Sequence, residues 1–205
     1  MGDSHWPLFG LRLRCRDVGL RPVRDDDLPL LAAIQPDDYE HDPRAEMLDG
    51  LDLAANRARL VYQSHWRSLG TWSPAKWQLD FAVEHQGTLV GVQSLEAEDF
   101  PTLRTVDSGS WLVPTVRGRG LGVSMRLAVL GLAFDHLGAL AAISSARHDN
   151  AASLGVSKRL GYTDNGVSLS DSTTGVFRLQ HVRLTAERWR HGGETAVDGL
   201  APCLP

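Results

Sequence analysis

The chain has little of what a disulfide-stabilised, metal-binding or membrane-spanning protein needs. Its 205 residues include only two cysteines, Cys15 and Cys203, near opposite ends. They give neither a disulfide framework nor a zinc-site spacing, so a reducing compartment is expected and a metal is not. The longest clearly apolar run, residues 127–134, is far shorter than the roughly 20 residues that span a bilayer. With no signal-peptide pattern at the start, a cytoplasmic protein without a membrane partner is predicted.

An excess of positive charge is also lacking. The 21 Lys and Arg residues are outnumbered by 25 Asp and Glu residues, which gives a formal net charge of -4 at pH 7. Nucleic acid is therefore not expected as a partner, because binding to phosphates needs a basic face. The 42% apolar and 22% charged residues are typical of a soluble protein with a normal core.

The hydrophobic pattern predicts an α+β fold with a mostly antiparallel central sheet, helices on both faces and one βαβ-like crossing. Strands are expected at 11–14, 19–23, 77–100 (a hairpin), 102–113, 139–146 and 176–184. Helices are expected at 24–34, 51–69, 120–137 and 149–162. Residues 1–190 are predicted to form a single domain, and residues 191–205 a loosely ordered tail.

Residues 116–122, Val-Arg-Gly-Arg-Gly-Leu-Gly, separate a predicted strand from a long apolar helix. Bare amides at a helix N-terminus bind anions, glycines allow close approach, and arginines add charge. The dinucleotide fingerprint fails because Val123 replaces its third glycine, and no Gly-Lys-Ser/Thr of a triphosphate loop follows. The remaining pattern is R-x-x-G-x-G, from Arg117, Gly120 and Gly122. The alternative is a tight turn with solvated arginines.

A second motif, Asn-Ala-Ala-Ser-Leu-Gly-Val-Ser-Lys-Arg-Leu-Gly-Tyr, follows at 150–162. Asn150 suits a helix N-cap, and Gly161 suits the position just past the helix end. The two motifs together resemble the GNAT superfamily of acyl-CoA-dependent N-acyltransferases, over roughly residues 10 to 190. The strand Asp-Ser-Gly-Ser-Trp-Leu before the loop and Ser153 favour the RimJ/RimL-like branch, which acylates ribosomal-protein N-termini.

The resemblance implies a GNAT-like fold and an acyl-CoA co-substrate, either acetyl-CoA or another such as succinyl-CoA. The loop amides would hold its pyrophosphate, with countercharge from the two loop arginines. The implied cofactor-binding residues are Val116, Arg117, Gly118, Arg119, Gly120, Leu121, Gly122, Asn150 and Ser153. A homodimer is a further expectation from the family.

The implied reaction is direct attack of an amine on the thioester, for which the amine must first lose a proton. Asp107, where RimJ/RimL-like sequences often carry Glu, is the first candidate for the base, with a hydrogen-bonded strand carboxylate as the alternative. Ser153 is the candidate acid, since the family's usual Tyr is replaced by Ser157 here; Ser153 also suits a first helical turn. Other polar candidates are expected to be solvated (Glu84, Glu96, Glu98 and His148), and Tyr162 is expected in the core.

The acceptor is a primary amine of a protein N-terminus, a lysine or a small metabolite. Three tryptophans, at least two of them expected in the core, surround the region that shapes the acceptor cleft in this family: Trp66, Trp72 and Trp77. A carboxylated acyl group would need a nearby cation, for which the chain offers Arg57, Arg59, Arg67 and Lys76. The alternative function is a non-catalytic acyl-CoA-binding sensor or partner protein on the same fold.

Overall fold

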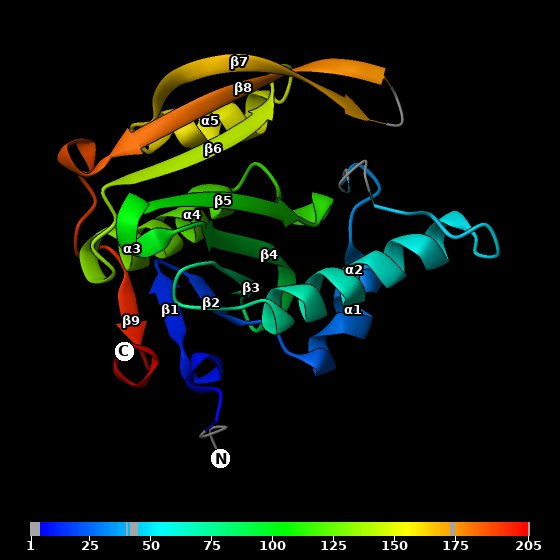
Figure 1. Ribbon diagram of the computed structural model, residues 1–205, viewed down its shortest axis with the longest axis horizontal. Helices are drawn as coiled ribbons and strands as arrows, with labels where there is room; N and C mark the ends of the chain where they lie inside the picture. Colours follow the sequence, from blue (N-terminus) through cyan, green and yellow to red (C-terminus); the bar gives the residue numbers. More distant parts are fainter. Residues whose placement is uncertain (1–4, 40, 42–44, 173–174, 205) are drawn as a thin grey trace.

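The computed structural model describes residues 5–39, 41, 45–172 and 175–204, and these form a nine-stranded sheet with helices on both faces (Figure 1). The strand order is β7-β8-β6-β5-β4-β3-β2-β1-β9. Neighbouring strands are antiparallel except β5 and β6, which are parallel. This confirms the predicted fold class. The strands are β1 (Arg12–Cys15), β2 (Val18–Pro22), β3 (Trp77–His85), β4 (Thr88–Ala97), β5 (Thr105–Leu112), β6 (Ala141–Arg147), β7 (Thr163–Ser172), β8 (Gly175–Thr185) and β9 (Ala196–Asp198).

The hydrophobic core has two parts, one on each face of the sheet, and helices cover both. On one face of the sheet, α1 (Leu28–Ile34) and α2 (Leu53–Gly70) cover a small cluster that includes Leu31 and Ala82. On the other face, α4 (Leu121–Gly131) packs through Leu127 and Leu130 against the larger cluster, and α5 (Ala151–Arg159) lies beside it. The short helix α3 (Phe100–Leu103) links β4 to β5. No helix in the described ranges is both long and apolar enough to cross a membrane.

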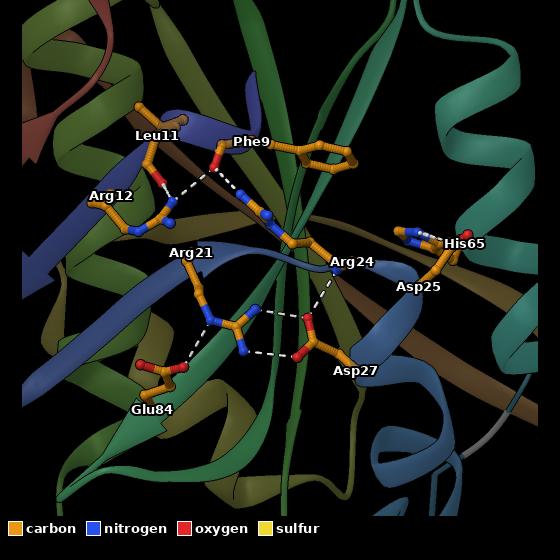
Figure 2. A network of polar contacts seen from close by, with 9 residues as sticks. All are labelled: Phe9, Leu11, Arg12, Arg21, Arg24, Asp25, Asp27, His65 and Glu84. Carbon is orange, nitrogen blue, oxygen red and sulfur yellow. Dashed lines mark hydrogen bonds and ion pairs between the residues drawn. The ribbon is translucent and has the colours of Figure 1, made fainter. Parts of the chain in front are cut away.

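A polar network fixes the start of α1 to the sheet (Figure 2). The Arg21 guanidinium on β2 donates to both carboxylate oxygens of Asp27, each at 2.7 Å, and to Glu84 on β3 at 2.8 Å. Nearby, His65 on α2 lies 3.2 Å from the Asp25 carboxylate. These contacts hold the α1–α2 layer in a defined position over the strands that form the floor beneath it.

The C-terminal segment differs from the sequence expectation. Within residues 191–205, predicted to be a loosely ordered tail, β9 pairs with β1 and places Val197 opposite Leu13. Thr195 packs against the helix end, where its hydroxyl donates to the Leu127 carbonyl at 3.1 Å. Gly131 makes this contact possible, since a Cβ there would lie 2.6 Å from Thr195 Oγ1. Edge pairing and one tight contact thus replace the hydrophobic periodicity that the segment lacks.

Candidate functional site

The central parallel strands β5 and β6 pair over only three residues each. Thr105 to Asp107 pairs with Ala141 to Ile143. The next contact is made by a side chain, because the Ser144 hydroxyl donates to the Ser108 carbonyl at 3.0 Å. Beyond it the strands separate toward their C-terminal ends (Figure 1). The wedge between them leaves the β6-facing edge of β5 without a strand partner in the described chain.

The Val116–Gly122 loop lies at the open end of this wedge, between β5 and the first turn of α4. Gly118 and Gly120 have φ values of +76° and +87°, which disfavour other residues. Residues 117–120 are exposed, whereas Leu121 is buried and anchors the helix start. Exposed backbone leading into a helix N-terminus has the form of an anion site.

Gly122 has a different role from the other two glycines. A Cβ at this position would lie 3.3 Å from Val156 Cγ2 on α5, so the glycine allows the two helices to approach. At the start of α5, Asn150 acts as N-cap, and its Oδ1 accepts from the Ser153 backbone N–H at 3.0 Å. Close packing of α4 and α5 brings the two sequence motifs together at the wedge.

The Arg117 side chain extends away from its loop toward the α1–α2 side. Its guanidinium forms a two-point ion pair with Asp38, with distances of 2.5 and 2.8 Å, and Nε donates to the Leu112 carbonyl at 2.9 Å. This pairing raises the pKa of Arg117 and lowers the pKa of Asp38. Arg119 is exposed at the loop surface. In this conformation, Arg117 connects the loop after α1 with the wedge entrance.

Asp107 lies at the narrow end of the wedge, as the last β5 residue paired with β6. Its carboxylate accepts from the Ser108 backbone N–H at 2.6 Å. Glu96 on β4 stands directly opposite in the sheet register. Burial raises the pKa of Asp107. Burial, followed by repulsion from Asp107 and Asp80, also raises the pKa of Glu96. The structure therefore brings together two candidate bases, Asp107, which the sequence analysis favoured, and Glu96, which it expected to be a solvated residue.

A cleft of about 480 Å³ opens over these two carboxylates, and its wall includes Arg67 and Trp77. Trp77 is buried and Trp72 packs against the core, while Trp66 is 53% exposed, so the expectation of two core tryptophans is confirmed. Of the candidate cations, Arg67 and Lys76 line this cleft, and Lys76 also pairs with Glu98 at 2.6 Å. Arg57 and Arg59 instead bind backbone carbonyls elsewhere, at residues 36–39 and 46.

The remaining candidates lie around α5. Ser153 is half-buried, and its carbonyl accepts from the buried Ser157 hydroxyl at 3.3 Å. Tyr162 is buried, as expected, and burial raises its pKa to about 12, so it stays protonated at neutral pH. His148 is exposed, also as expected. Among the described residues, no group of three or more His, Cys, Asp or Glu side chains is arranged to hold a metal ion.

Comparison with known proteins agrees with this geometry. Residues 17–163 match the acetyltransferase (GNAT) domain, so the chain belongs to the GNAT acetyltransferase family. Among solved structures it is similar to Mycobacterium smegmatis RimJ in complex with CoA-disulfide, with a TM-score of 0.72, 22% identity, and coverage of 88% of this chain and 90% of that one.

Two further structures share the fold. A spermidine N-acetyltransferase chimera from Vibrio cholerae and hSSAT aligns with a TM-score of 0.64 and 15% identity, over 84% of this chain and 97% of that one. RimL, a ribosomal alpha-N-protein acetyltransferase, aligns with a TM-score of 0.63 and 15% identity, over 82% and 90% respectively. At these identities, the likeness concerns the fold.

Proposed function

We propose that the protein transfers an acyl group from acyl-CoA to a primary amine by direct attack. Acetyl is the first candidate group and succinyl the second. The acceptor is the N-terminus of a protein, as for RimL, an alpha-N-protein acetyltransferase, or else a lysine or a small metabolite. The observation that carries this proposal is the wedge between β5 and β6, which joins the glycine-rich loop to the two carboxylates in the cleft.

The residues at the wide end of the wedge suit an acyl-CoA co-substrate. Left-handed Gly118 and Gly120 expose backbone near the N-terminus of α4, where a pyrophosphate is favoured, and Arg119 supplies charge. Arg117 could contribute only after giving up Asp38. Asn150 and Ser153, at the start of α5, are the residues proposed to contact the co-substrate from that side. The unpaired edge of β5 offers hydrogen-bonding groups to an extended ligand.

The chemistry begins with removal of a proton from the acceptor ammonium. Asp107 is the proposed base, and its raised pKa makes it a stronger proton acceptor than an ordinary carboxylate. The amine then attacks the thioester carbonyl, whose oxygen is stabilised by backbone N–H groups of β5. The carbon–sulfur bond then breaks and sulfur takes the electron pair. The hydroxyl of half-buried Ser153 gives the leaving thiolate a proton, and the second proton, which the attacking nitrogen loses as it becomes an amide, returns Ser153 to its neutral form.

A non-catalytic acyl-CoA-binding role is the second candidate. It is favoured by Ser157, which replaces the tyrosine usual in the family and whose hydroxyl is hydrogen-bonded into the interior. Such a protein would keep the loop and lose the acid–base groups.

A turnover assay separates the two functions. Thiol release is measured with acetyl-CoA and succinyl-CoA, each against a peptide N-terminus, a lysine derivative and a small amine, and products are checked by mass spectrometry. The transferase predicts thiol and acylated amine in equal amounts for at least one pair. Binding of acyl-CoA without either product would support the sensor. Size-exclusion chromatography with light scattering tests the expected homodimer.

A further inference from the structure

A buried arginine lies beneath the narrow end of the wedge, and the proposed chemistry does not use it. Arg126 on α4 is only 3% exposed. Its Nη1 group donates to the hydroxyls of Ser144 on β6 and Ser157 on α5, both at 3.3 Å. Nε has no hydrogen-bond partner among the described residues. Burying a guanidinium against hydroxyls rather than a carboxylate is unfavourable for folding, so its presence calls for a reason.

Each of the two serine hydroxyls in turn donates a hydrogen bond to the backbone of a segment that carries a proposed catalytic residue. Ser144 Oγ donates to the carbonyl of Ser108, the residue after Asp107, at 3.0 Å. Ser157 Oγ donates to the carbonyl of Ser153 at 3.3 Å. One guanidinium on α4 thus links both strands of the wedge and the first turns of α5.

We propose that Arg126 is a positioning residue for acyl transfer: it fixes β5, β6 and α5 to one another and so sets the distance between Asp107 and Ser153. This inference rests on the proposed function. It explains why a charged side chain is buried on α4, whose other buried residues are all uncharged. A displacement of about 1 Å at a reacting group can lower a rate by about 100-fold. Loss of the Arg126 hydrogen bonds should therefore lower turnover strongly.

The charge of Arg126 gives the proposal a second readout. Burial raises the pKa of Asp107, and the Ser108 N–H and the Arg126 charge act against that rise. Removing the charge should therefore raise the pKa of Asp107 further and move the acidic limb of the pH–rate profile to higher pH. The other charged or titratable groups around Asp107 are Glu96 on β4, His181 on β8, Tyr162 after α5 and, across the cleft, Arg67, Lys76 and Glu98.

The test compares Arg126→Met, which keeps the length without charge or donors, with Arg126→Lys, which keeps the charge. Met125→Leu, a buried neighbour on the same helix, is the matched control. Arg126→Met should fold with an unchanged or higher Tm, because apolar replacements of buried charges are often neutral or stabilising. In Arg126→Met, we expect kcat to fall about 10- to 100-fold, with a smaller change in KM for acyl-CoA. The acidic limb of its pH–rate profile should move to higher pH. Lysine should restore the limb and part of kcat.

Several outcomes would overturn the proposal. Wild-type kcat and pH profile in Arg126→Met would do so, as would a kcat loss that follows a lowered Tm and that lysine does not restore. If Arg126→Met does not fold, Ser144→Ala and Ser157→Ala remove the links singly, and unchanged kcat in both would be decisive. If the wild type turns over no donor–acceptor pair, the proposed function fails. Positioning is then judged by hydrogen exchange at Ser108 to Ser110, and unchanged exchange in Arg126→Met refutes it.

Discussion

Replacing Asp107 with asparagine removes the proposed base and changes little else. The side chains have nearly the same shape, and the amide oxygen can still accept the 2.6 Å hydrogen bond from the Ser108 backbone N–H. Positioned general bases contribute about 10²- to 10⁴-fold, which corresponds to about 3–5 kcal/mol of activation free energy. Glu96 stands opposite and also has a raised pKa, so it can partly substitute. We therefore expect a loss of kcat near the lower limit, about 100-fold.

The same substitution has an opposite effect on stability. Because the pKa of Asp107 is raised on folding, the folded state binds a proton more tightly than the unfolded state does. The resulting destabilisation is absent below the unfolded pKa and complete above the folded pKa. Asparagine carries no such charge, so the variant should have an equal or higher Tm at neutral pH. That advantage should vanish in acid.

The assay is initial-rate thiol release across the pH range in which the protein is folded, with Glu96→Gln as the matched variant. The residual activity of Asp107→Asn should follow the titration of Glu96, so its acidic limb should differ from that of the wild type, whereas Glu96→Gln should keep the wild-type limb. The reasoning is refuted if Asp107→Asn retains wild-type kcat, or if it loses activity only in proportion to a lowered Tm. A larger loss in Glu96→Gln than in Asp107→Asn would reassign the base to Glu96.

Three other substitutions, with Gly155→Ala as a control for the first, test the scaffold. Gly120→Ala forces alanine into the left-handed region, so it should lower stability by about 1–2 kcal/mol and weaken acyl-CoA binding in a calorimetric titration. The control Gly155→Ala lies in a helix with open space around it, so it should raise stability by about 0.5–1 kcal/mol and leave the affinity for acyl-CoA unchanged. Arg21→Ala should cost about 2 kcal/mol at neutral pH in urea unfolding. Burial alone would raise the pKa of Asp27, but hydrogen bonds from Arg21 and a backbone N–H outweigh it and lower that pKa, so the difference should shrink as pH falls through the lowered value; equal loss in acid would contradict this. Gly131→Ala should displace β9, cost about 1–3 kcal/mol and speed proteolysis of the tail, whereas an unchanged Tm would show the contact to be unimportant.

The sequence predicted those elements that bury one face. Alternating apolar residues in 77–100 and the apolar run near 127–134 led to the β3–β4 hairpin and to α4. Strand β7 was missed because its sequence, Thr-Asp-Asn-Gly-Val-Ser-Leu-Ser-Asp-Ser, is largely polar and is held by hydrogen bonds to β8. Strand β9 was missed for a similar reason, since three residues paired at an edge leave no periodicity to detect.

Some features of the candidate site could be predicted from the sequence, and others depend on the fold. The loop and the Asn150 helix could be found because glycine and cap residues have local conformational requirements. The pairing of Glu96 with Asp107 depends on the β4–β5 register, and the contact of Arg117 with Asp38 joins residues 79 positions apart. Arg126 gave no sequence signal beyond one charge within an apolar helix. Only the fold shows which hydroxyls surround it.

The short β5–β6 pairing gives the sheet four edges instead of two. The outer edges are β7 and the three-residue β9, and the inner edges are the facing sides of β5 and β6 beyond Asp107 and Ile143. Outer edges invite pairing with other chains, which makes them a risk for aggregation. Inner edges, which have no strand partner in the part of the chain that the structure describes, lie in the middle of the molecule, away from that risk. The protein can thus offer unpaired backbone to a ligand while limiting what it offers to its neighbours in solution.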